Sequence, residues 1–323
     1  MEDMVNRSSR MIRLAFVMWL SAIALEAKAI DIDTAAKIYQ AAAIREQVRA
    51  SLGVMPDRIR QLFAADTAAE LSEAQLAAVT AAAVRGFRID VFETPALKSL
   101  ADHLDSASVN KTETFLTGDL GRRMVSADIA LANLGEANID KVMNGELSAP
   151  STPKRDLLID KLERATHSTE STVQIFLGMG QSVAVGTAVG SGMDTAAVEE
   201  RAHRSGEASR AGLEENMRLP MRRLMAYGYR DLSDSDLKHV LTFLESTAGK
   251  RYVAANNAAM GAGFDAMGRR TGEQLGESLR ELAQARASEP PPNLPPASIA
   301  APVPVLPHTR PASPEPPPTM PSH

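Results

Sequence analysis

Apolar residues recur along most of this chain at the three- and four-residue spacing of helices that bury one face. In the clearest case, Ser233 and Asp236 have the spacing of a capping box, in which two side chains bond free backbone N–H groups at a helix start. The apolar stripe that follows falls at positions i, i+3, i+4 and i+7: Leu237, Val240, Leu241 and Leu244. A helix is therefore predicted from Ser233 to near Glu245.

Other helix starts carry comparable signals. Ser72 and Gln75 have the spacing of a second capping box. Thr94-Pro95 and Thr152-Pro153 each place an N-cap residue before a proline, which suits the first helical position because the N–H that proline lacks has no partner there. Apolar residues continue one stripe from residue 260 to residue 282, and this stripe predicts a long final helix.

One short segment admits a different interpretation. Phe87, Ile89 and Val91 alternate with charged residues, which is the pattern of a half-buried strand. Val84, Phe87 and Val91 also share one helical face, and the flanking sequence is rich in alanine. The pattern favours a helix here.

Composition supports an all-α fold and narrows the function. Aromatic residues make up only 4% of the chain, and alanine is abundant, which favours helices over a β-sandwich. Cysteine is absent, so the chain has no disulfide framework and no thiol nucleophile. A net charge of −5 argues against general nucleic-acid binding.

A phrase of the sequence occurs twice, with an offset of 128 residues. Between residues 114 and 127, seven of fourteen residues are identical to their counterparts in 242–255, where composition alone would give about one. The offset exceeds the period of a solenoid, about 20–50 residues. We therefore predict two tandem related helical bundle modules, at residues 30–150 and 151–288.

Each copy of the phrase contains an aromatic residue, a glycine and a basic pair. The glycine is expected to let another backbone approach closely, with the aromatic packed over the corner between two helices. The basic pair indicates either an anionic partner or a structural salt bridge. The candidate binding residues are Phe115, Gly121, Arg122 and Arg123 in the first copy, and Phe243, Gly249, Lys250 and Arg251 in the second.

This pattern resembles a family of exported bacterial proteins known as domain of unknown function 2059. The resemblance rests on an apolar helix that ends in an aromatic, a turn of small residues, and a glycine followed by a basic residue. Here these are Leu232-Ser233, Phe243, Ser246-Thr247 and Gly249-Lys250. The first copy, with Phe115, Gly121 and Arg122, is a degenerate match. The resemblance implies an all-helical periplasmic protein, and it implies no reaction and no catalytic residue.

The two ends of the chain differ from the part between them. Three arginines, an apolar run over 14–25 and the sequence Ala27-Lys28-Ala29 predict a signal peptide over residues 1–29, with an uncleaved membrane anchor as the alternative. A periplasmic or secreted location follows. Residues 289–323 contain 14 of the 19 prolines, which predicts a disordered tail. The tail serves either as a spacer or docking peptide, or only to improve solubility.

Residues 173–193 are rich in glycine, and no charged residue lies between Glu170 and Asp194. Gly178, Ser182, Gly186 and Gly190 recur every four residues, a spacing that lets helices pack backbone to backbone, as in membrane interfaces. One hypothesis is therefore membrane contact or self-association through this segment. The alternatives are a buried helix of a soluble protein and a flexible loop, since the glycines weaken a helix.

The sequence carries no recognisable catalytic or cofactor motif. The six histidines lack the spacing of metal ligands, and no nucleotide-binding or nucleophile-elbow sequence is found. No metal and no cofactor are predicted, and the pattern favours a non-enzymatic protein that binds an envelope protein or an anionic envelope component. The alternatives are a membrane-associated or self-assembling protein that acts through 173–193, and a hydrolase with its site between the modules.

Overall fold

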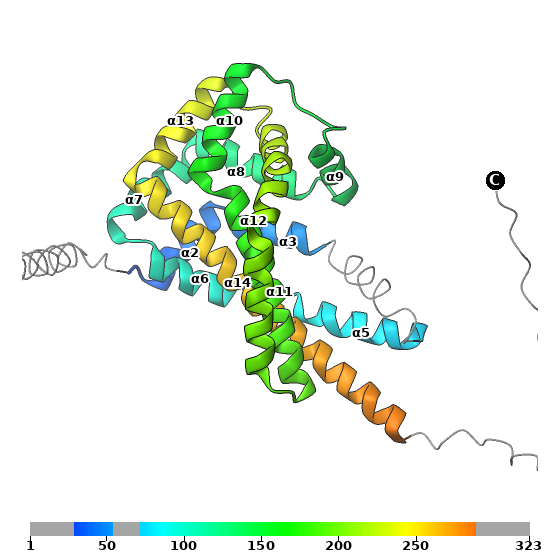
Figure 1. Cartoon of the computed structure of the whole chain (residues 1–323). Helices are drawn as coiled ribbons and strands as arrows, with labels where there is room; N and C mark the ends of the chain where they lie inside the picture. Colours follow the sequence, from blue (N-terminus) through cyan, green and yellow to red (C-terminus); the bar gives the residue numbers. More distant parts are fainter. Residues whose placement is uncertain (1–28, 54–71, 289–323) are drawn as a thin grey trace, which may run out of the picture.

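The structure is a computed structural model that describes residues 29–53 and 72–288 (Figure 1). Throughout these residues the regular elements are helices, apart from an isolated bridge between Ala29 and Asp105, so the all-α prediction is confirmed. The predicted signal peptide, except its last residue, and the predicted proline-rich tail lie outside the described residues.

Most of the described helices are between nine and fifteen residues long. Three are much longer: α11, α12 and α14. In chain order they are α2 (Ile32–Ala41), α3 (Ile44–Leu52), α5 (Glu73–Gly86), α6 (Ile89–His103), α7 (Ser106–Thr117), α8 (Asp119–Ala132), α9 (Glu136–Asn144), α10 (Pro153–Thr166), α11 (Ser168–Ser191), α12 (Thr195–Gly228), α13 (Asp234–Glu245) and α14 (Thr247–Ser288).

Three of the predicted helix starts are confirmed. Both capping boxes are present, at the N-termini of α5 and α13. At the start of α10, the Thr152 hydroxyl accepts a hydrogen bond of 3.2 Å from the backbone N–H of Arg155, and Pro153 occupies the first helical position. Caps of this kind each stabilise a helix by about 1 kcal/mol.

The predicted start at Thr94-Pro95 is wrong, because α6 begins at Ile89 and contains Pro95. Packing explains the extension: the Phe92 side chain is fully buried and meets the Phe264 ring edge-on at 5.3 Å between centroids. Burying this ring outweighs the backbone hydrogen bond that a proline inside a helix removes. Residues 89–91 of the alternating segment are helical, whereas Phe87 and Arg88 join α5 to α6, so the segment is not a strand and the predicted helix is interrupted there.

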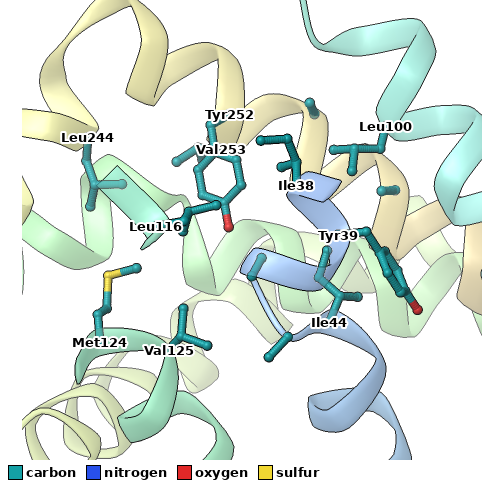
Figure 2. Close-up of a cluster of buried hydrophobic side chains, with 14 of the residues drawn as sticks. Ile38, Tyr39, Ile44, Leu100, Leu116, Met124, Val125, Leu244, Tyr252 and Val253 are labelled. Atoms are coloured by element: carbon teal, nitrogen blue, oxygen red, sulfur yellow. The ribbon is translucent and has the colours of Figure 1, made fainter. Parts of the chain in front are cut away.

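A large cluster of buried side chains includes residues from both predicted modules. Figure 2 shows part of it, with Ile38 and Leu100 from the N-terminal half and Leu244 and Val253 from the C-terminal half. In Figure 1, α14 runs through the molecule, and it packs against α11, α6, α5 and α7. A boundary at residue 150 therefore crosses a shared core, and the division into two modules stays a prediction.

The glycine-rich segment is helical and packs on α14. A Cβ atom placed on Gly186 would lie 2.2 Å from the carbonyl oxygen of Arg269, and one on Gly272 would lie 2.1 Å from that of Val183. Backbone contact between α11 and α14 therefore requires glycine on both helices. By length and composition α11 could also cross a membrane, and 28% of its most apolar window is buried.

Candidate functional site

The two copies of the repeated phrase fold into helix corners with the same geometry. The first joins α7 to α8 through the single residue Gly118, and the second joins α13 to α14 through Ser246. Both linking residues are extended, with φ and ψ of −68° and 162° at Gly118 and −67° and 162° at Ser246. These equivalent residues are separated by the 128-residue offset found in the sequence.

Each corner depends on its glycine. A Cβ atom on Gly121 would lie 2.0 Å from the carbonyl oxygen of Phe115, and one on Gly249 would lie 2.0 Å from that of Phe243. No real Cβ atom tolerates so short a contact with backbone, so both positions exclude every larger residue without movement of the helices. The close approach predicted for the two glycines is confirmed.

The sequence pattern predicted that each of the two aromatic residues covers its own corner, and this prediction is wrong. Phe115 and Phe243 stack on one another, with centroids 3.9 Å apart and ring planes 8° from parallel. Tyr252 lies beside this pair, 6.3 Å from Phe243. The corners therefore face each other across a shared aromatic contact.

One ion pair connects each corner to the start of the opposite helix pair. Arg123 of α8 donates two hydrogen bonds, of 2.7 and 3.0 Å, to the carboxylate of Asp236, which also closes the capping box of α13. Arg251 of α14 lies 3.4 Å from the carboxylate of Asp105, the N-cap of α7. The hydrogen bonds from Arg123, followed by those from Ser233, hold the pKa of Asp236 well below its ordinary value.

Three of the four basic candidates thus serve structural contacts. Besides Arg123 and Arg251, Arg122 pairs with Asp119 and donates to the carbonyl oxygen of Thr117 within its own corner. The salt-bridge interpretation of the basic pairs is confirmed for these arginines. The remaining candidate, Lys250, has a different environment.

Lys250 lines a surface pocket of about 410 Å³ between α10, α13 and the start of α14. Lys161, Arg164 and His167 line the same pocket, and Glu245 contributes a single acidic group. Within the described part of the chain, Lys161, Arg164 and Lys250 form no ion pair. We call Lys161, Arg164, His167 and Lys250 the basic pocket.

Local structure explains how the basic pocket assembles. Lys161 and Arg164 lie three residues apart on the exposed face of α10, while Leu158 and Leu162 on its other face are buried. His167 ends α10 in the left-handed conformation, with a φ of 52°, and so turns the chain into α11. Their spacing on an amphipathic helix was visible in the sequence, but their proximity to Lys250 is a property of the fold.

No metal site accompanies these groups in the residues that the structure describes: nowhere do three or more histidine and acidic side chains lie close enough to hold an ion.

Comparison with known proteins finds a family match that includes the second corner. Residues 220–278 match the family described as "Uncharacterized protein conserved in bacteria (DUF2059)". This range contains α13, much of α14, and the candidates Phe243, Gly249 and Lys250. The predicted resemblance is confirmed there, and the matched range does not reach the first corner. Searches of curated proteins and of solved structures find no match to the chain.

Proposed function

We propose that this protein is exported and acts by binding an anionic component of the bacterial envelope, or an acidic part of an envelope protein, at the basic pocket. The observation that carries this proposal is the convergence of Lys161, Arg164 and Lys250 on one pocket without ion-pair partners in the described chain. The predicted signal peptide and the bacterial family match support a location in the envelope.

The chemistry of the basic pocket suits a carboxylate or phosphate group. The Arg164 guanidinium can donate two parallel hydrogen bonds to such a group, and the two lysines add mobile positive charges. Because the chain as a whole carries a net charge of −5, this concentration of positive charge is local and would select where an anion binds.

The proposal includes two related copies of one helical hairpin, α7–α8 and α13–α14. Helix α13 begins and ends 128 residues after α7 begins and ends, and α14 begins 128 residues after α8 begins. Only the second copy supplies a cation, Lys250, to the basic pocket. The equivalent residue in the first copy, Arg122, is held by Asp119, so the copies would differ in function.

Vesicle binding tests this function with matched charge changes. The full-length mature protein should co-float with vesicles that contain phosphatidylglycerol and remain unbound with phosphatidylcholine alone. Lys250→Glu together with Lys161→Glu should weaken binding at least tenfold, and binding should fall with added salt. Lys111→Glu with Lys238→Glu makes the same change in net charge at exposed residues outside the pocket and should bind normally.

Equal loss in both double variants would show that only overall charge matters and would contradict the proposal. If no variant binds any anionic vesicle, crosslinking in intact cells, with wild-type protein and with Lys250→Glu, decides whether an envelope protein occupies the pocket. If Lys250→Glu captures the same proteins as the wild-type protein, this second form of the proposal is excluded.

A second candidate function is membrane association through residues 173–193. Its support is that α11 is long and apolar enough to span a bilayer. In addition, Phe176 within α11 and Met193 just after it are each 60% exposed. Binding to neutral vesicles that is lost in Phe176→Gln with Met193→Gln would favour this function. Gly186→Leu is unsuitable as a test, because its side chain would separate α11 from α14.

A further inference from the structure

A second cavity, of about 120 Å³, lies among α8, α10, α13, α14 and the end of α12. It shares only Leu244 with the residues that line the basic pocket. One part of its wall is polar, with Asp128, Thr166, Tyr229, Tyr252, Asn256 and Asn257. The rest is largely apolar and includes Met124, Leu162, Val240 and Val253.

Asp128 is the single charged side chain in this wall. Burial raises the pKa of its carboxyl group to about 7, and a hydrogen bond from Tyr229 opposes that shift. Within the described residues Asp128 has no ion pair with a lysine, arginine or histidine. Tyr252 faces it from α14, and its own pKa is raised by burial and by the nearby carboxylate. Asp128 is partly buried, and a partly buried carboxylate of this kind is stabilised by a cation that the chain does not supply.

We propose that this cavity binds a small primary alkylammonium ion. The ammonium group would pair with the Asp128 carboxylate, with the hydroxyl oxygens of the tyrosines and the amide oxygen of Asn256 as further acceptors. The short alkyl group would contact the apolar wall. Figure 2 shows Met124 and Leu244 pointing toward one another from α8 and α13, at this wall.

Size and composition separate this ligand from other cations. A dry cavity of about 150 Å³ holds one benzene molecule, so the volume here suits an ion of about four to six heavy atoms. Calcium sites in proteins rely on carboxylates among their roughly six to eight oxygen ligands, whereas this wall, within the described residues, contains a single carboxylate and no cluster of acidic side chains. Tyrosine rings also attract an organic ammonium ion through their faces.

Titration of the full-length mature protein with propylammonium chloride at pH 8 tests the proposal, with calorimetry and NMR as readouts. Propylammonium should bind saturably, with a dissociation constant below about 10 mM, and a nuclear Overhauser effect should connect its methyl group to that of Met124. Propanol, a neutral molecule of the same shape, and propionate, an anion of similar size, should bind at least tenfold more weakly.

Asp128→Asn keeps the shape of the side chain and should weaken propylammonium binding at least tenfold. Asp265→Asn is the matched control, because Asp265 is another acid whose pKa burial raises, yet it lies outside this cavity. Equal affinity for propanol, unchanged binding by Asp128→Asn, or no saturation up to about 50 mM would each overturn the proposal. If Asp128→Asn fails to fold, the contact to Met124 in the wild-type protein decides. This result is independent of vesicle binding at the basic pocket.

Discussion

Replacing Gly249 by alanine should destabilise the protein, although the same replacement stabilises most helices. The added Cβ atom would lie 2.0 Å from the carbonyl oxygen of Phe243 and 2.6 Å from the Cα atom of Leu244. Comfortable contact needs about 3.5 Å, so the start of α14 must move away from the end of α13 by about 1 Å or more. A single residue, Ser246, joins the two helices and cannot absorb this shift.

The two opposing contributions can be compared. Alanine in place of glycine favours a helix by about 1 kcal/mol. Forcing apart a packed core costs about 1–3 kcal/mol and sometimes more. Leu244 and Ala248, on either side of the corner, are each only 4% exposed, so the core has little room to relax. We therefore expect Gly249→Ala to lower the free energy of unfolding by up to about 2 kcal/mol.

Urea denaturation followed by circular dichroism at 222 nm measures this change. Gly261→Ala is the matched control on the same helix, because a Cβ atom there would meet nothing within 4 Å, and it should raise stability by up to about 1 kcal/mol. Gly121→Ala should resemble Gly249→Ala, since its contact with Phe115 is also 2.0 Å. If Gly249→Ala is as stabilising as Gly261→Ala, the close backbone contact at the corner does not exist.

Three further predictions concern other contacts. A double-mutant cycle on Arg123→Ala and Asp236→Asn should give a stabilising coupling at neutral pH that shrinks as the pH falls toward the low pKa of Asp236. Zero coupling at neutral pH would refute the pair. Gly272→Ala should destabilise the α11–α14 contact and increase hydrogen exchange in both helices, whereas Gly212→Ala, where the added Cβ would meet nothing, should not. The pKa of Asp128 is about 7 in the folded protein against 3.8 ordinarily, so between these pH values the folded state holds a proton that the unfolded state has released. Stability should therefore fall as the pH rises from about 4 to 7, by no more than about 4 kcal/mol. A pH profile of stability identical to that of Asp128→Asn would contradict this.

The sequence was sufficient for features that depend on neighbouring residues. Capping at Ser72, Thr152 and Ser233 and the glycine corners follow from contacts within a few residues, and they were predicted correctly. Local rules failed at Pro95, where burial of Phe92 against α14 lengthens a helix that proline would otherwise begin.

Features that depend on distant residues could not be derived in this way. The basic pocket brings Lys250 to within reach of residues about ninety positions earlier, and no local pattern states that α10 packs beside α13. Likewise, the acceptors of Arg123 and Arg251 each belong to the opposite hairpin. The sequence indicated that these arginines have anionic partners, and only the fold distinguishes an internal carboxylate from an external ligand.

The reciprocal ion pairs bear on why both corners retain an arginine. Asp105 is equivalent by offset to Ser233, and Asp236 is equivalent to Ser108, so the acid stands at a different position of the first turn in each helix. In each hairpin that carboxylate still binds a backbone N–H at the helix start and the arginine from the opposite hairpin. The two hairpins thus make equivalent contacts with each other through carboxylates that stand one turn apart. With Phe115 stacked on Phe243, the contact is self-complementary, as in a symmetric dimer, and this supports the proposal that the hairpins are copies.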